Sequence, residues 1–195
     1  MSEKRIRRTP DEARAIILET TKRVMLEEGY AAASTRRVAQ VAGISARLVH
    51  YYYPKTDDLL IALYRHTSQQ DLDSLLAALR SDDPVSALWG HQTQGERAAL
   101  GAEFLALANH RKAIKSEIVR YTERVRELQA EMLAERVHEI SKTGPCPPLC
   151  MATLMTSVSR TLIMEDAVGI SLGHAETKAF VAGVLAYLGK SRPTD

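Results

Sequence analysis

The chain has few cysteines, few aromatic residues and almost no net charge. Its two cysteines, Cys146 and Cys150, flank two prolines without a histidine nearby, which favours reduced thiols in a loop over a disulfide or a metal site. Aromatic residues make up only 5% of the chain, which argues against a cavity walled by aromatic rings. We therefore expect no metal ion and no cofactor.

Long apolar runs and the common catalytic motifs are also missing. No uninterrupted apolar stretch approaches the ~20 residues that a bilayer crossing needs, and the first residues lack the apolar core of a secretion signal. The chain has no glycine-rich phosphate loop, no nucleophile elbow and no metal-spaced set of His, Cys and Asp. These observations predict a cytoplasmic protein that is not an enzyme.

The pattern that is present is helical. Apolar residues recur every three or four positions throughout, and no segment alternates long enough for a strand. Hydrophobic residues make up 45% of the chain and charged residues 26%, as in ordinary globular proteins. We expect an all-α fold of about nine helices.

Residues 34–54 spell two short helices joined by a tight turn. Ser34 and Ser45 are suited to cap the starts of the two helices, Gly43 can end the first, and Pro54 stops the second. Two helices of about two turns each are typical of a helix-turn-helix, whose second helix enters the major groove of DNA. An excess of basic residues accompanies this motif, because residues 1–66 hold 12 Lys and Arg against 8 Asp and Glu.

A longer pattern surrounds this motif and consists of Gly29-Tyr30, Val38-Ala39, Ala42-Gly43-Ile44-Ser45 and the aromatic run before Pro54. With these residues, the segment from about residue 12 to residue 62 resembles the N-terminal domain of the tetracycline-repressor (TetR) family. The resemblance implies a DNA-binding domain over residues 1–55 and a ligand-binding and dimerisation domain over residues 56–195, with a helix at about 56–80 as connector. It also implies a ligand-responsive transcriptional regulator, most often a repressor, that binds a palindromic operator as a homodimer.

Ten residues are expected to contact DNA. By matching positions, the resemblance places eight of them on the family's DNA-facing surface: Thr35, Ser45, Ala46, Arg47, His50, Tyr51, Tyr52 and Thr56. Arg36 is added because an arginine at this place can reach a base edge or a phosphate. Lys55 is added because Thr56 replaces the family's phosphate-binding lysine in this chain, and Lys55 lies one position earlier.

The remaining three quarters of the chain carry no motif, so its sites follow from residue types. Seven residues are candidates either for a small-molecule site or for the core: Trp89, His91, Phe104, Tyr121, Met151, Met155 and Arg160. Because methionines give an adaptable apolar lining, the effector is expected to be mainly apolar, with one polar end.

The last two helices have apolar residues on more than one face, which predicts a partner for the second face. The family forms its dimer through these helices, so the resemblance assigns the interface to Leu154, Val158, Leu162, Phe180, Gly183, Val184 and Tyr187.

A different function stays open. Because Ala46, Leu48 and Thr56 replace more usual polar residues, the chain is alternatively a helical interaction protein that kept the fold and lost specific DNA binding.

Overall fold

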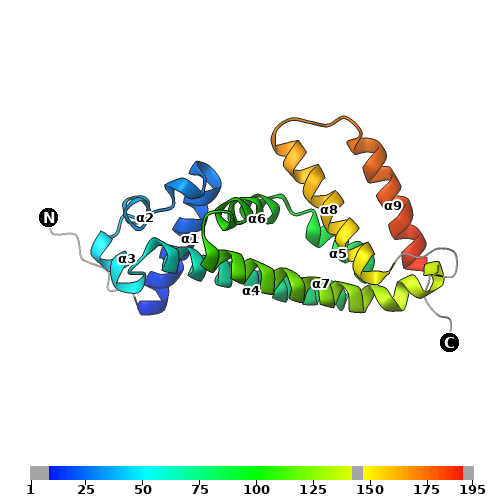
Figure 1. The fold of residues 1–195 in the computed structure, drawn as a ribbon, viewed down its shortest axis with the longest axis horizontal. Helices are drawn as coiled ribbons and strands as arrows, with labels where there is room; N and C mark the ends of the chain where they lie inside the picture. Colours follow the sequence, from blue (N-terminus) through cyan, green and yellow to red (C-terminus); the bar gives the residue numbers. More distant parts are fainter. Residues whose placement is uncertain (1–8, 142–146, 191–195) are drawn as a thin grey trace. The chain divides into compact units, whose positions relative to one another are not determined.

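The computed structural model describes residues 9–141 and 147–190, and these residues form nine α-helices, one short 3-10 helix and no β-strand (Figure 1). The elements in chain order are α1 (Pro10–Glu28), η1 (Tyr30–Ala32), α2 (Thr35–Ala42), α3 (Ala46–Tyr52), α4 (Thr56–Leu79), α5 (Pro84–Gln92), α6 (Gly95–Ala108), α7 (Lys112–Ser141), α8 (Pro148–Ala167) and α9 (His174–Lys190). The prediction of an all-α fold with about nine helices is confirmed.

Local capping signals set the helix starts. Thr9 and Glu12 form a reciprocal capping box at the start of α1, and Pro10 occupies its first turn, where no backbone donor is needed. Asp83 caps α5 by accepting from the Ser86 amide at 3.2 Å. Such caps stabilise a helix by about 0.5–2 kcal/mol each.

Contacts within the chain divide it into two compact units. Of the described residues, unit 1 holds those up to Thr67 together with Leu100–Ile118, and unit 2 holds Ser68–Ala99 together with those from Val119 onward. Unit 1 thus extends past residue 55, because it includes the start of α4 and parts of α6 and α7. The predicted division into a DNA-binding domain over residues 1–55 and a ligand-binding and dimerisation domain over residues 56–195 stays a prediction.

The core of unit 1 joins the first three helices. Ile17, Val24 and Met25 of α1 are fully buried, as are Val38 of α2 and Val49 of α3. Burying one such side chain contributes about 1.5–3 kcal/mol. The short helices α2 and α3 therefore depend on packing against α1 rather than on their own helix propensity.

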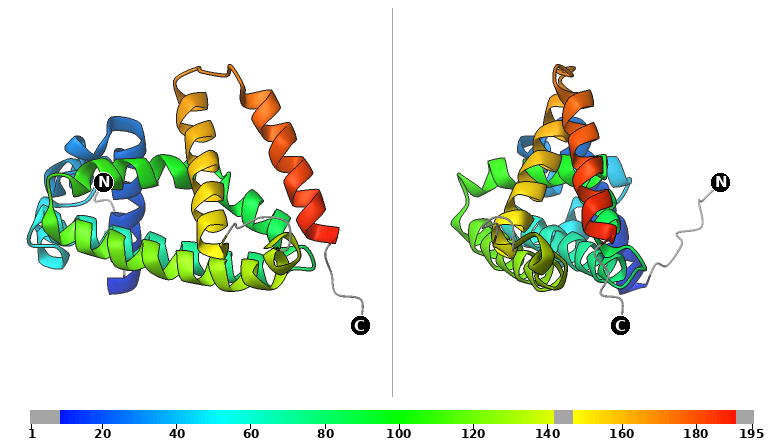
Figure 2. Two further views of the ribbon diagram at one scale, coloured as in Figure 1. Left: turned by 45° about the vertical axis from the view of Figure 1, so that its right-hand side comes forward. Right: turned by 90° about the vertical axis from the view of Figure 1, so that its right-hand side faces the viewer.

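The core of unit 2 is formed by α4, α5, α7 and α8. Its buried apolar cluster consists of Leu75, Val85, Leu88, Leu133, Ala152 and Met155. α8 and α9 form an antiparallel hairpin (Figure 2). The buried ring of His174 joins the start of α9 to the end of α8, because it lies 2.9 Å from an Asp166 carboxylate oxygen and 2.8 Å from a Glu165 carboxylate oxygen.

Three further findings concern what the described residues could bind or cross. Cys150 is an exposed free thiol at the start of α8, whereas Cys146 lies outside the described residues. Within residues 9–141 and 147–190, no group of three or more His, Cys, Asp or Glu side chains is placed to hold a metal ion. In the same residues, no helix has both the length and the apolar character required to span a membrane.

Candidate nucleic-acid interface and a buried polar cluster

Two serines and one glycine shape the helix-turn-helix of unit 1. The Ser34 hydroxyl oxygen accepts from the Arg37 amide at 3.2 Å, and that of Ser45 accepts from the Leu48 amide at 3.3 Å. Between the two helices Gly43 has a φ of 64°, a left-handed conformation that other residues rarely adopt. The turn thereby places α3 at an angle to α2.

One side of α3 packs into the core and the other side faces out. Val49 is completely buried whereas Leu48 is half-buried, so Val49 is the residue of α3 that packs into the core. Ala46, Arg47 and His50 are exposed on the outer side. A seven-residue helix held by a single buried valine thus presents a row of side chains to a ligand outside the protein.

Seven of the ten predicted DNA contacts are exposed: Arg36, Ser45, Ala46, Arg47, His50, Tyr51 and Lys55. Thr35, Tyr52 and Thr56 are half-buried. The Tyr52 ring lies 5.3 Å from the Arg14 guanidinium, so this tyrosine also packs against α1. The structure brings all ten residues onto α2, α3 and the start of α4, and their contact with DNA stays a prediction.

Neighbouring arginines have different roles. Arg37 is held by Glu28, because its Nε and Nη2 groups donate to the carboxylate at 2.9 and 2.8 Å. The hydrogen bond from Arg37 lowers the pKa of Glu28 below its usual value. Arg36 and Arg47 have no acidic partner within the described part of the chain, and both are exposed. Their guanidinium groups are available for bases or phosphates.

α6 contributes a further contact to unit 1. A carboxylate oxygen of Glu103 accepts a hydrogen bond from the Tyr30 amide at 2.7 Å. The Tyr64 and Phe104 rings pack edge to face, with their centres 4.9 Å apart. Sequence reasoning had no signal for this contact, because Tyr30 and Glu103 are 73 positions apart.

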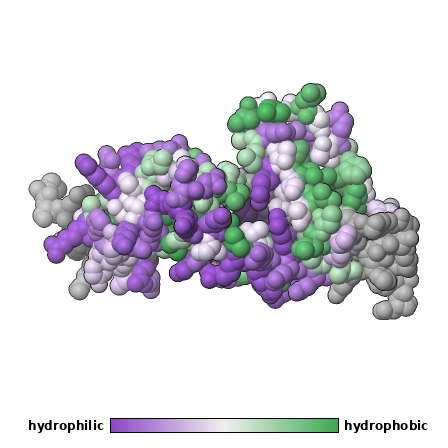
Figure 3. Space-filling view, in the orientation of Figure 1, coloured by the Kyte–Doolittle hydropathy of each residue, from purple (hydrophilic) through white to green (hydrophobic). Residues whose placement is uncertain are grey.

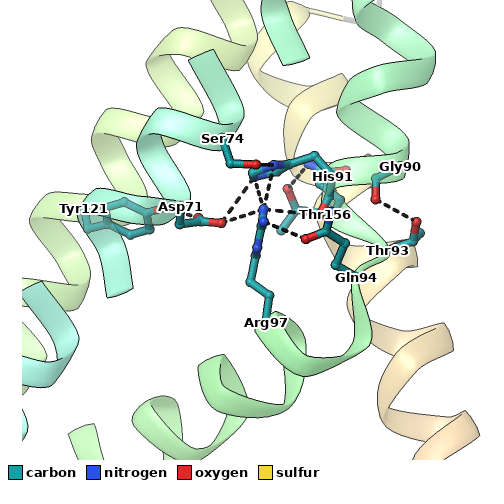
Figure 4. Close-up of polar contacts among 10 residues, drawn as sticks. Asp71, Ser74, Gly90, His91, Thr93, Gln94, Arg97, Tyr121 and Thr156 are labelled. Carbon is teal, nitrogen blue, oxygen red and sulfur yellow. Dashed lines mark hydrogen bonds and ion pairs between the residues drawn. The ribbon is translucent and has the colours of Figure 1, made fainter. Parts of the chain in front are cut away.

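A buried polar cluster joins four helices of unit 2 (Figure 4). Asp71 of α4 is at its centre, with Oδ1 2.6 Å from Nη1 of Arg97 in α6 and 3.3 Å from Nε2 of His91 in α5. The Tyr121 hydroxyl of α7 donates to Oδ2 of Asp71, and the Ser74 hydroxyl lies 3.3 Å from Nδ1 of His91. We call these five residues the Asp71 cluster.

The surroundings of Asp71 keep it ionised. Burial alone would raise the pKa of its carboxyl group, but the hydrogen bonds from His91 and Tyr121 and the charge of Arg97 outweigh burial, and the pKa lies below its usual value. Asp71 continues the buried stripe of α4, which runs through Leu60, Leu63 and Leu75 at helical spacing. That spacing distinguishes Asp71 from the exposed Asp73. Sequence reasoning missed this signal.

The seven candidate effector residues do not form one group. The structure brings His91 and Tyr121 together at Asp71, while Met155 is buried in the core of unit 2 with Trp89 and Met151 packed around it. Phe104 lies in unit 1 against Tyr64, and Arg160 is exposed. Sequence reasoning missed Asp71, Ser74 and Arg97.

The predicted interface residues divide by exposure. Leu154, Phe180 and Tyr187 are large apolar side chains that are 52%, 73% and 55% exposed. Gly183 is exposed, and a Cβ atom there would meet nothing within 4 Å. The others pack within the chain to different degrees: Val158 and Val184 are half-buried and Leu162 is buried.

Comparisons with known proteins agree with this geometry. Residues 17–63 match the family model of bacterial regulatory proteins of the tetR family. The HTH-type transcriptional regulator BetI of Rhizobium meliloti (strain 1021) is 34% identical over 86 residues, which are 44% of this chain; the chain spans only 38% of that relative's length.

Solved structures share the fold over nearly the whole chain. A transcriptional regulator of Saccharomonospora viridis, solved in complex with choline, aligns with a TM-score of 0.73 and 19% identity over 88% of this chain and 96% of that one. A TetR transcription regulator of Haloarcula marismortui ATCC 43049 aligns with a TM-score of 0.71 and 20% identity, over 90% of this chain and 97% of that chain.

The helix-turn-helix of unit 1, in a chain whose described residues form only helices and no strand, is the motif of helix-turn-helix DNA-binding proteins. Within this class, residues 17–63 match the tetR family of bacterial regulatory proteins, and solved TetR-family structures share the fold of the chain.

The exposed Tyr51 hydroxyl leads to a prediction about affinity. Tyr51 is 77% exposed, and its ring packs edge to face on that of Tyr52, so a substitution that removes only the hydroxyl keeps the packing. We expect Tyr51→Phe to weaken binding to every duplex by about 0.5–1.5 kcal/mol, because a phosphate contact positions the protein without reading bases. Fluorescence anisotropy with specific and random duplexes measures this, and a change in sequence preference would contradict it.

Proposed function

We propose that the protein is a ligand-responsive, homodimeric repressor that binds a palindromic operator through α3. The observation that carries this proposal is the outer side of α3, where exposed Arg47 has no acidic partner in the described residues while buried Val49 holds the helix in place. An arginine is the commonest specific reader of guanine in the major groove. The proposal includes a cytoplasmic location and no enzymatic activity.

The apolar surface of α8 and α9 supports the dimer. Figure 3 shows hydrophobic residues gathered over these two helices and the loop that joins them. Leu154, Phe180 and Tyr187 belong to this surface, and in the loop Leu172 is 94% exposed. Monomers rarely expose so much contiguous apolar surface, and a two-fold axis would pair the surface with itself. Two copies of α3 would then meet half-sites about 34–36 Å apart.

The proposed effector is a small, mainly apolar molecule with one polar end. Half-buried Trp89 and Met151 border the apolar core of unit 2, and the Asp71 cluster supplies polar groups in the same unit. Sites of this kind combine an apolar lining with a few placed polar groups. Choline in the Saccharomonospora viridis structure shows that a protein of this fold holds a small molecule.

Selection of bound duplexes from a random pool tests the function. We expect an enriched palindrome that the protein prefers over random DNA at physiological salt, where nonspecific binding fades. A repressor further requires that this palindrome lower transcription from an adjacent promoter in a reconstituted assay. The interaction-protein alternative is motivated by Ala46, Leu48 and Thr56, which replace more usual polar contacts. It predicts no enriched sequence and DNA binding that disappears with rising salt.

A further inference from the structure

The Asp71 cluster combines a fixed anion with a movable cation. Asp71 has a short side chain on α4 and is 20% exposed; the Tyr121 hydroxyl donates to its Oδ2, while its Oδ1 lies 2.6 Å from Nη1 of Arg97 and 3.3 Å from Nε2 of His91. Arg97 has a long side chain from the first turn of α6 and is 28% exposed; its Nη1 also contacts the His91 ring, and its Nη2 donates to exposed Gln94. The ion pair can therefore open on the side of Arg97.

Opening the pair has unequal consequences for its two members. A part-exposed guanidinium that swings away is hydrated by water at little cost. A carboxylate left in a largely buried place needs another positive group, because an unpaired buried charge is strongly unfavourable. His91 already lies 3.3 Å from Asp71 while Arg97 is in place, so it supplies no new contact when Arg97 moves away.

The sign of a suitable guest follows from this difference. A guest cation can neutralise the negative charge of the Asp71 carboxylate while the Arg97 side chain moves to solvent. A guest anion near Arg97 would instead lie beside the Asp71 carboxylate, which cannot leave the α4 interior position. Like charges at such a distance in a poorly hydrated site repel strongly.

We propose that Asp71 binds the positively charged end of a mainly apolar small molecule, an alkylammonium-type cation, which takes the place of the Arg97 guanidinium. The proposal rests on the proposed function, since it names the chemical class of the effector. Arg97 and Glu103 are both on α6, and Glu103 accepts from Tyr30 in unit 1. Release of Arg97 thus changes what holds the first turn of α6, a helix whose later residues, from Leu100 on, belong to unit 1.

Calorimetric titration of the full-length protein with hexylamine, hexanoate and hexanol tests the proposal, because these probes share one alkyl chain and differ in charge. We expect hexylamine to bind most tightly. Asp71→Asn should weaken hexylamine binding by about tenfold or more, since a charge-assisted contact is lost. Asp73→Asn, an exposed position on the same helix, is the matched control and should leave binding unchanged.

Arg97→Gln separates this role from a structural one. Removal of the internal competitor should tighten hexylamine binding severalfold, whereas a purely structural ion pair predicts unchanged or weaker binding. This variant keeps the test decisive even if Asp71→Asn fails to fold. Preferred binding of hexanoate, equal binding of all three probes, or no binding of hexylamine to folded protein would overturn the proposal.

Operator release by hexylamine is measured separately. Because calorimetry needs no DNA, hexylamine binding that depends on Asp71 without any selected operator would overturn the proposed function and leave the cation site standing. Specific operator binding by a protein that does not bind hexylamine would overturn the cation site and leave the DNA-binding function standing.

Discussion

Gly183→Arg is expected to convert the proposed homodimer into monomers of 21.6 kDa and to abolish specific operator binding. Gly183 lies on the exposed side of α9 near Phe180 and Tyr187, so an arginine there would place a charge in the proposed apolar interface. Affinity for the full operator should fall on the order of 10²-fold or more, because a monomer offers one reading helix in place of two.

The substitution should not disturb the subunit itself. A Cβ at Gly183 meets open space, and replacing a helical glycine removes an unfavourable residue worth about 0.8–1.0 kcal/mol relative to alanine. Gly101→Arg on α6 is the matched control, since Gly101 is also exposed, helical and open at Cβ. Sedimentation should show monomers for the first variant and dimers for the second. A dimeric Gly183→Arg protein with full operator affinity would place the interface elsewhere.

Arg47→Ala is expected to cost about 1–3 kcal/mol per half-site on the selected operator and much less on random DNA. The exposed position and the lack of an acidic partner in the described residues leave the guanidinium free to reach a base edge. Truncation also removes no packing from the core, because Val49 rather than Arg47 anchors α3.

Binding titrations with both duplexes measure this prediction. Arg80→Ala serves as control, because Arg80 is exposed but lies in unit 2, and it should leave the affinity for either duplex unchanged. Equal losses on operator and random DNA for Arg47→Ala would make Arg47 a phosphate contact rather than a base reader.

Local chemistry explains why the helices could be predicted. The start of α1 at Pro10 follows from local chemistry, because Pro10 and the Thr9 cap act within one turn of the chain. The end of α2 at Gly43 follows in the same way, since a glycine with positive φ is a local stop signal. The identification of the helix-turn-helix needed only such neighbouring residues.

The sites were less accessible to sequence reasoning. Phe104 was a candidate for the effector site, yet it packs on Tyr64 in unit 1, which only a contact across 40 positions of sequence reveals. Met155 was a candidate for the same site, and its burial among Leu75 and Leu88 makes it part of the core. Composition and spacing do not separate a methionine that lines a site from one that fills a core.

The sequence by itself determined the all-α architecture, the helix boundaries near caps and prolines, and the helix-turn-helix with its TetR resemblance, because these depend on interactions within a few residues. The tertiary structure alone decided that Glu28 pairs with Arg37, that Arg36 and Arg47 have no acidic partner among residues 9–141 and 147–190, and that Asp71, His91, Arg97 and Tyr121 meet in one cluster. Such groupings arise from the packing of whole helices, which brings together charges that are distant in the chain and whose energies depend on the burial they then share.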